Sequence, residues 1–110
     1  MENNELLRKY ELMIIVDARL TNEERESVWK EVMEIVNKGG GKVVNSRVWL
    51  ERHKLAFSIK KCREGTYYLI NMEGPGTLVE KIRSLLKNYE KVLRFSVIYV
   101  ESFAAVAVKV

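Results

Sequence analysis

Apolar residues alternate along residues 48–60, but the alternation changes phase in the middle of this stretch. Apolar side chains occupy even positions before Glu51 and odd positions after Lys54. Successive side chains of a strand point to opposite faces, so one face holds both sets only if the chain slips by one residue. We therefore predict a long strand with a β-bulge near Arg52 or His53, which would re-aim the basic side chains there.

Further strand-like segments contain apolar residues at odd and even positions, as strands covered on both faces do. We expect strands at 10–16, 42–60, 66–73 and 92–100. The first is expected in the middle of a sheet and the last is expected to be well covered. Residues 61–65 are expected to form a hairpin loop in which Gly65 adopts a positive φ.

Two segments instead have apolar residues at the three- and four-residue spacing of an amphipathic helix. The first begins at Thr21, where Thr21-Asn22-Glu23-Glu24 forms a capping box, and it ends at the glycines 39–41. This triple glycine follows a helix, so we interpret it as a cap rather than a phosphate-binding loop. The second helix runs from about Leu78 to Tyr89, with Pro75 at its start.

The resulting order β-α-β-β-α-β predicts an α+β fold, the ferredoxin-like split β-α-β sandwich. In this fold a four-stranded antiparallel sheet carries two helices on one face, and its other face is partly open. We expect a single domain over residues 1–110, with a core at about 8–101 and a flexible or partner-bound tail at 102–110.

Charge is distributed unevenly along the chain. Residues 42–63 contain seven basic residues and one acid, whereas residues 23–34 contain five acids and two basic residues. This asymmetry favours a polyanion as the partner of one side of the molecule. A solvated edge strand guarded by charges against aggregation would give the same pattern, and this alternative stays open here.

The chain offers little of what catalysis requires, since a nucleophile, acid or base needs an orienting neighbour. His53 has no carboxylate partner beyond Glu51, and a surface or RNA-contacting role suits it better. Cys62 lies in a basic segment that would favour a thiolate, but it lacks a base or resolving cysteine. No metal-ligand spacing recurs, so the sequence gives no argument for a metal site.

The adjacent tyrosines Tyr67 and Tyr68 place one ring on each face of the sheet. Exposed aromatic rings of such a sheet can stack on RNA bases, but the glycine-and-aromatic signature of that RNA-recognition module is absent. We interpret the tyrosines as ordinary sheet packing, and basic side chains of the hairpin as the better RNA ligands.

The chain contains no apolar run long enough to span a membrane, and its first residues lack the pattern of a signal peptide. Its one cysteine, Cys62, has no partner within the chain for a disulfide, as is usual in a reducing compartment. We therefore expect a cytoplasmic protein.

Five motifs in sequence resemble those of the bacterial small-subunit ribosomal protein six family. They are Arg8-Lys9-Tyr10-Glu11, Gly40 through Val43, Trp49 through Ile59, Glu64 through Tyr68, and Tyr89 through Phe95. The third is similar to the family pattern Trp-Gly-x-Arg-x-Leu-Ala-Tyr-Pro-Ile. It departs from that pattern at Leu50, Phe57 and Ser58, and it is one residue longer between Trp49 and Leu55.

The resemblance implies a structural, non-enzymatic protein of the small ribosomal subunit in the cytoplasm, without a cofactor. It implies binding to the central domain of 16S ribosomal RNA together with ribosomal protein eighteen, which lies along the open sheet and its edge. Mapped by motif, the RNA-binding residues would be Arg8, Lys9, Arg52, Lys54, Lys87 and Arg94. Position in the basic stretch adds His53, and charge alone adds Lys60, Lys61 and Arg63.

Two other functions are compatible with this fold. A small-ligand regulatory or oligomerisation domain would require a concave apolar pocket with convergent polar groups. An acyl-phosphate hydrolase would require a glycine-rich anion loop after the first strand, which residues 17–21 do not provide.

Overall fold

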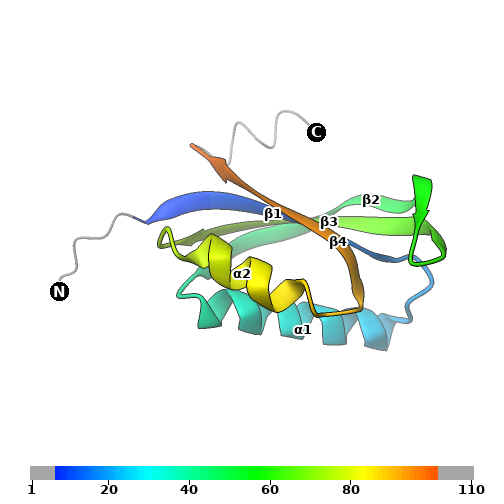
Figure 1. The fold of residues 1–110 in the computed structure, drawn as a ribbon, viewed down its shortest axis with the longest axis horizontal. Coiled ribbons are helices and arrows are strands. Elements are labelled where there is room, and N and C mark those ends of the chain that lie inside the picture. The colour runs from blue at the N-terminus through cyan, green and yellow to red at the C-terminus, as the bar shows by residue number, and fades with distance from the viewer. Residues whose placement is uncertain (1–6, 102–110) are drawn as a thin grey trace.

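The computed structural model describes residues 7–101, which form an antiparallel sheet of four strands with two helices on one face (Figure 1). The elements are β1 (Arg8–Asp17), α1 (Asn22–Lys38), β2 (Lys42–Ile59), β3 (Cys62–Gly74), α2 (Leu78–Leu86) and β4 (Val92–Val100). The predicted order and the ferredoxin-like architecture are confirmed. The fate predicted for residues 102–110 lies outside the described residues.

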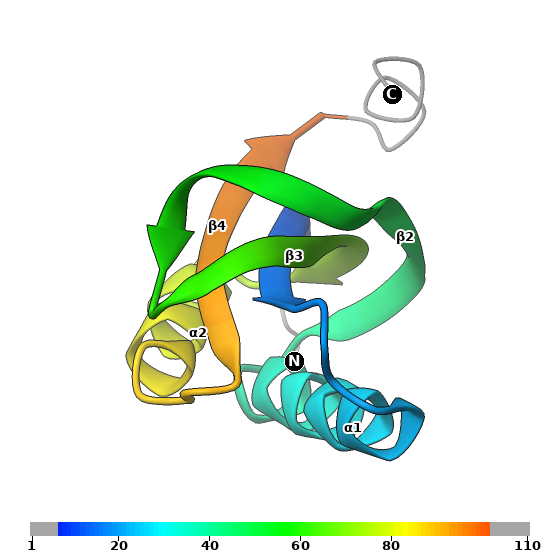
Figure 2. The ribbon, with the colours of Figure 1, turned by 90° about the vertical axis from the view of Figure 1, so that its right-hand side faces the viewer.

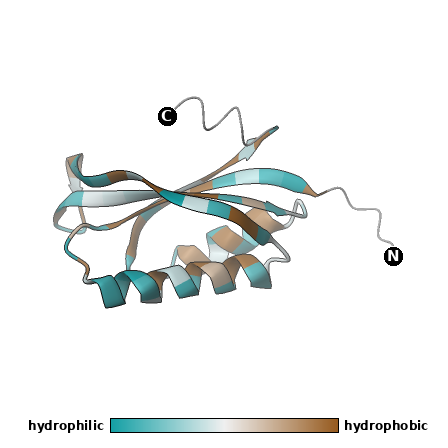
Figure 3. Ribbon diagram, turned by 180° about the vertical axis from the view of Figure 1, so that it is seen from behind, coloured by the Kyte–Doolittle hydropathy of each residue, from teal (hydrophilic) through white to brown (hydrophobic). Residues whose placement is uncertain are grey.

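The strand order is β2-β3-β1-β4, so β1 lies in the interior of the sheet as predicted. Its even-numbered side chains, among them Leu12 and Ile14, are fully buried between sheet and helices with Ile70 and Met72 of β3. Figure 3 shows hydrophobic residues concentrated in α2 and in the second half of α1. The main hydrophobic core is therefore a layer between the sheet and the helices, whereas Ile15, Leu55 and Leu69 are buried outside this cluster.

The ends of α1 are those that its sequence specifies. The Thr21 side chain accepts a hydrogen bond from the Glu24 N–H at 3.2 Å, and Glu24 Oε1 accepts one from the Thr21 N–H at 2.9 Å. This reciprocal pair confirms the predicted capping box. At the other end Gly39 caps the helix, and Gly40 turns the chain with a φ of +85° that a residue with a Cβ disfavours.

Helix α2 is shorter than predicted, because it ends at Leu86 rather than Tyr89. The proline prediction was also wrong in detail, since Pro75 lies in the turn before the helix rather than in its first turn. Its carbonyl accepts a hydrogen bond from the Leu78 N–H at 3.0 Å, so Gly76 and Thr77 intervene before the helix begins.

Strand β4 has the predicted bounds but not the predicted coverage. It is an edge strand whose only neighbour is β1, and Ile98 and Tyr99 are 49% and 63% exposed. An apolar pattern on both faces thus marks here a strand whose outer surface is open within residues 7–101.

The predicted bulge in β2 is confirmed. Leu50 pairs with Tyr67 and His53 pairs with Gly65, so three steps along β2 oppose two along β3. Arg52 absorbs the extra residue with a φ of +47°. The bulge bends β2, and the second half of the strand then curls across the face of the sheet turned away from the helices (Figure 2).

The hairpin prediction was wrong, because β3 begins at Cys62 and only Lys60 and Lys61 form the turn. Both lysines have positive φ, at 49° and 68°, as a two-residue type I′ turn requires. Gly65 instead lies within β3 and does not have a positive φ. A Cβ on Gly65 would lie 2.5 Å from Ile15 Cγ2, so glycine is needed there for close packing.

Candidate nucleic-acid interface and open sheet face

Basic side chains from distant parts of the chain gather at the end of the sheet where β1 stops. A hollow of about 370 Å³ is lined there by Arg19, Arg52, Lys61 and Arg63 together with Asp17 and Glu64. A neighbouring hollow adds Lys60 of the turn and the adjacent Glu90 and Lys91 of the loop before β4. We call this set the basic end, and it consists of Arg19, Arg52, Lys60, Lys61, Arg63 and Lys91.

Two members of the basic end were missed in the sequence, namely Arg19 and Lys91. Neither lies in the basic segment 42–63. Arg19 follows β1 and Lys91 immediately precedes β4, and the antiparallel pairing of these strands places both at one edge. Mapping charges onto the predicted topology, rather than along the chain, would have found both residues.

The bulge fixes the orientation of Arg52. Its backbone N–H donates to Thr66 Oγ1 at 3.3 Å, and its guanidinium NH1 donates to the Ala18 carbonyl at 2.9 Å. Its NH2 lies 3.4 Å from Glu64 Oε1, with both side chains about half exposed. Arg52 therefore ties β2 to the end of β1 while part of its guanidinium remains accessible.

Beneath the basic end, Asp17 holds together the end of β1 and the start of β3. Arg19 donates to both carboxylate oxygens of Asp17, at 3.1 and 2.9 Å, and the Cys62 thiol donates to Oδ2 at 3.3 Å. The hydrogen bonds from Arg19 lower the pKa of Asp17 to about 2.

The thiolate predicted at Cys62 was wrong. The side chain is buried, and burial followed by the hydrogen bond to the Asp17 carboxylate raises the pKa of the thiol. The nearby Arg19 acts in the opposite sense but more weakly. Cys62 is thus a neutral hydrogen-bond donor within the fold.

His53 and Lys54 follow the bulge and are exposed. The His53 ring packs edge-on against Tyr67, with centroids 5.7 Å apart, and Trp49 packs on the same tyrosine at 5.8 Å. Tyr68 instead packs against the core on the helix side. Both tyrosines thus serve sheet packing, as predicted.

Four other predicted RNA-binding residues do not line the hollows of the basic end. Arg8 and Lys9 begin β1, and the nine steps to Asp17 correspond to about 30 Å of strand. Arg94 pairs with Ile15 and is exposed on the open face, whereas Lys87 is the C-cap of α2. The fold therefore gathers only part of the predicted set into one surface.

Three carboxylates, Asp17, Glu64 and Glu90, line the hollows of the basic end beside its six cations. Glu51, the only acid among residues 42–63, forms an ion pair with Arg25 of α1 at 3.2 Å. In residues 7–101, Lys60, Lys61 and Arg63 take part in no ion pair, in contrast to Arg19 and Arg52. The hairpin tip consequently carries uncompensated positive charge.

The open face of the sheet has a different chemistry near its middle. One row across the strands consists of Asn45, Asn71, Glu11 and Ile98, which are register partners. Asn71 Nδ2 donates to Asn45 Oδ1 at 2.8 Å, but Asn71 Oδ1 and Glu11 Oε2 are buried without a hydrogen-bond partner. Burial raises the pKa of Glu11, and the charge of Arg47 opposes that shift. We call this set the acceptor row.

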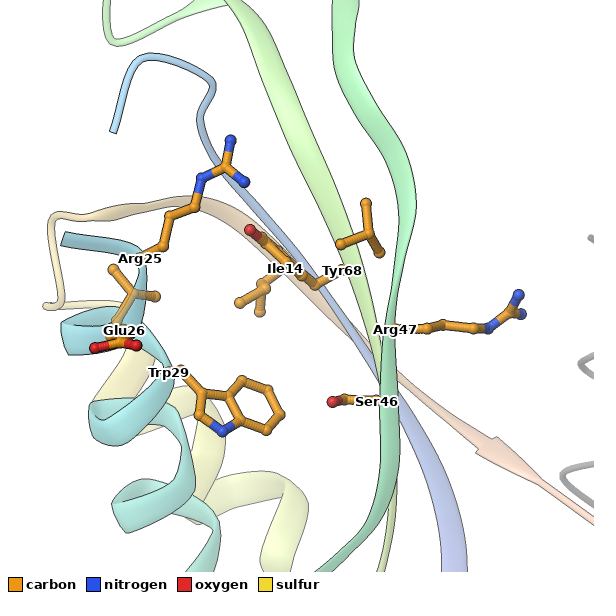
Figure 4. Close-up of a pocket in the computed structure, with 9 residues that line it drawn as sticks. Ile14, Arg25, Glu26, Trp29, Ser46, Arg47 and Tyr68 are labelled. Carbon is orange, nitrogen blue, oxygen red and sulfur yellow. The ribbon is translucent and has the colours of Figure 1, made fainter. Parts of the chain in front are cut away.

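An apolar groove of about 270 Å³ lies between α1 and the edge strand β2 (Figure 4). Trp29 of α1 faces Ser46 of β2 across it, while the Arg47 side chain points away to the other side of the strand. Its rim carries Val48, which is 46% exposed. The groove and the strand edge together form an apolar surface beside the open face.

In residues 7–101, no three His, Cys, Asp or Glu side chains gather closely enough to hold a metal ion. Neither helix in this range has the length and apolar content that crossing a bilayer requires.

Comparison with known proteins identifies the family of this chain. A model of the family described as Ribosomal protein S6 matches residues 9–99. The chain is 33% identical over 101 residues to small ribosomal subunit protein bS6 of Campylobacter lari, covering 92% of this chain and 81% of that protein. It is 33% identical over 95 residues to bS6 of Dictyoglomus turgidum, covering 86% and 97%.

Solved structures share the fold. The crystal structure of 30S ribosomal protein S6 from Thermotoga maritima superposes with a TM-score of 0.77 at 24% identity, over 94% of this chain and 97% of that one. The C-terminal domain of the MgtC protein from Mycobacterium tuberculosis gives a TM-score of 0.58 at 12% identity, over 92% and 95%. This chain therefore shares its arrangement of strands and helices with both solved structures.

Proposed function

The chain belongs to the ribosomal protein S6 family, as a structural component of the small ribosomal subunit in the cytoplasm, and on this premise we propose that it binds 16S ribosomal RNA together with ribosomal protein eighteen. The family consists of structural proteins rather than enzymes. Its membership confirms the resemblance inferred from the five sequence motifs. The RNA site and the protein partner are the parts that we propose.

The observation that carries the RNA proposal is the basic end. Six cationic side chains from five places in the chain surround two adjoining hollows, and those of the hairpin tip are uncompensated within residues 7–101. Such a surface neutralises phosphates and releases counterions, which supplies most of the affinity of a protein for a nucleic-acid backbone. His53 and Lys54 extend this surface along β2, and Thr66 fixes the bulge that aims it.

The remaining predicted contacts lie at three places outside the hollows of the basic end. Arg8 and Lys9 would contact RNA at the opposite end of β1, and Lys87 and Arg94 would do so at the end of α2 and on β4. These four assignments depend on the resemblance, because none of the four residues lines the hollows of the basic end.

We place ribosomal protein eighteen on the open face and along the free edge of β2. The edge exposes Val44 and Val48 at 44% and 46% and borders the apolar groove, an arrangement that suits a protein partner better than a phosphate backbone. The acceptor row adds buried polar groups to the same face.

Removing two charges tests the RNA proposal. Arg52→Ala together with Lys54→Ala should weaken binding to a 16S central-domain fragment and reduce the log–log salt slope by roughly one unit per lost phosphate contact. Filter binding across a range of salt concentrations measures both quantities. An unchanged slope would exclude these two residues from the RNA interface.

The matched control is Lys30→Ala with Lys81→Ala, which removes the same charge from the exposed surfaces of α1 and α2. Because these lysines lie in the helix layer, the slope should stay at its wild-type value. A slope that falls equally in both double variants would indicate a general charge effect rather than a site.

The alternative of a small-ligand regulatory domain finds less support. The groove of about 270 Å³ falls just below the range of about 300 to 1,000 Å³ typical of ligand pockets. Arg25, which lines it, is engaged by Glu51 at 3.2 Å, so convergent polar groups are few.

A further inference from the structure

The acceptor row presents two buried oxygens that lack donors. Glu11 of β1 and Asn71 of β3 are direct register partners, which places their Cβ atoms about 5 Å apart on the open face. Glu11 is only 8% exposed, yet its Oε2 accepts no hydrogen bond, and neither does Asn71 Oδ1. A buried carboxylate oxygen without a donor is costly, so this pair calls for a ligand that donates.

The cations of the chain do not supply that donor. On the open face, the next row of register partners toward the start of β1 contains Lys9, Glu73 and Lys42. The next row in the opposite direction contains Arg47. Arg47 is close enough to influence Glu11 electrostatically, but neither it nor any other described residue donates to Oε2. The β4 neighbour is the apolar Ile98, which is 49% exposed.

The geometry selects among donors. A phosphate backbone brings further acceptors and negative charge, which would be repelled by Glu11. An ammonium group satisfies one acceptor well, whereas a planar guanidinium donates to two acceptors side by side and can lie flat on an apolar neighbour. Ile98 and Met13 provide such apolar surface beside the pair.

We propose that Glu11 and Asn71 form a recognition site for an arginine side chain of the protein partner that covers the open sheet face. This inference rests on the proposed pairing with ribosomal protein eighteen and names the contact that would make the pairing specific. The arginine would donate to Glu11 Oε2 and Asn71 Oδ1 and so satisfy both buried oxygens at once.

Glu11→Gln is the direct test, measured with the full-length chain and recombinant ribosomal protein eighteen of the same bacterium. Calorimetry should show affinity reduced by about 30-fold or more, as expected when one partner of a buried charge pair loses its charge. The melting temperature of the free variant should instead rise, because the buried charge is removed. A merely structural role of Glu11 would lower both.

Glu73→Gln is the matched control, since it makes the same chemical change on the same face one row away. Its affinity for protein eighteen should stay within about threefold of wild type. Lysine substitutions of the partner's arginines, made one at a time, complete the test. Substituting the arginine that binds here should weaken binding to the wild-type chain. The same substitution should weaken binding to the Glu11→Gln variant only slightly, because the contact is already lost there.

Several outcomes would overturn the inference. Equal affinity of wild type and Glu11→Gln would show that the carboxylate takes no part in pairing. A lower melting temperature of free Glu11→Gln would show that Glu11 already has a donor within the chain. Weaker RNA binding with unchanged protein binding would assign the site to RNA. If wild type itself does not bind protein eighteen, the proposed pairing fails and this inference fails with it.

Discussion

Glu11 and Asp17 lie on the same strand and the same face of the sheet, yet their surroundings are opposite. Six residues separate them, about 20 Å of β1. Asp17 accepts three side-chain hydrogen bonds and its pKa falls to about 2, whereas Glu11 Oε2 accepts none and burial raises the pKa of Glu11. The Asp17 carboxylate is satisfied by donors of the described chain, whereas Glu11 Oε2 has no donor within residues 7–101.

The difference distinguishes the two interfaces that we propose on one sheet. At the basic end, buried groups are paired among themselves and the surplus charge is positive and exposed, which suits RNA phosphates. In the acceptor row, the surplus is negative and buried, which suits a single well-placed cation. A protein that joins an RNA and a second protein needs both, and β1 carries one at its end and the other near its start.

Gly65→Ala should have the largest effect. It should disturb the basic end and leave the acceptor row intact. The added methyl would overlap Ile15 Cγ2 and push the second half of β2 off the sheet. We expect the free energy of unfolding to fall by about 2 kcal/mol, measured by urea denaturation, with weaker RNA binding. Binding to protein eighteen should remain.

Gly76→Ala is the control for that variant. Gly76 is exposed, and the nearest atoms to an added methyl belong to the flexible end of Arg8. Its unfolding free energy should change by less than about 0.5 kcal/mol. Wild-type stability of Gly65→Ala would contradict the packing of β2 over Ile15.

Replacing the turn between β2 and β3 tests whether the basic end acts through its charge rather than through the stability of the fold. Lys60→Asn with Lys61→Gly removes two cations and installs the preferred sequence of a type I′ turn. RNA affinity should fall about tenfold, with a salt slope lower by up to roughly two units, while thermal stability is equal or higher. Unchanged RNA binding would remove the hairpin tip from the interface.

The pH dependence of stability should show the smallest effect. Asp17 and Glu11 should contribute to the free energy of unfolding with opposite signs. The lowered pKa of Asp17 adds stability above about pH 4 that is lost as the pH falls toward 2, by about 1 kcal/mol after solvent screening. Glu11, whose pKa is raised, is destabilising once the pH rises above its ordinary value of 4.5. Melting temperatures of Asp17→Asn and Glu11→Gln across pH 2 to 7 should diverge from wild type in opposite directions.

Much of the fold was predictable because local patterns specified it. The phase change in β2 required a bulge, and the capping box fixed the start of α1. The hairpin turn was missed because Lys60-Lys61 lacks the glycine or asparagine that usually marks positive φ. The loop predicted at Gly65 was wrong, since a glycine is needed there for close packing rather than for a bend.

The candidate site was less predictable, because it depends on which elements meet. Arg19 and Lys91 join the basic end only after β1 and β4 pair, and Arg8 and Lys9 are separated from it by the length of a strand. The environment of Glu11 is equally hidden in the sequence. Its register partners, Asn71 and Ile98, come from two strands that are far from Glu11 in the sequence.

The place of β1 in the sheet has a consequence for how the chain is made. β1 emerges first from the translating ribosome, but its neighbours β3 and β4 end at residues 74 and 100. At bacterial synthesis rates the strand waits roughly 5 to 15 seconds for its last neighbour. β1 gains β3 as a neighbour first, and its sheet is complete only after residue 100 has been added.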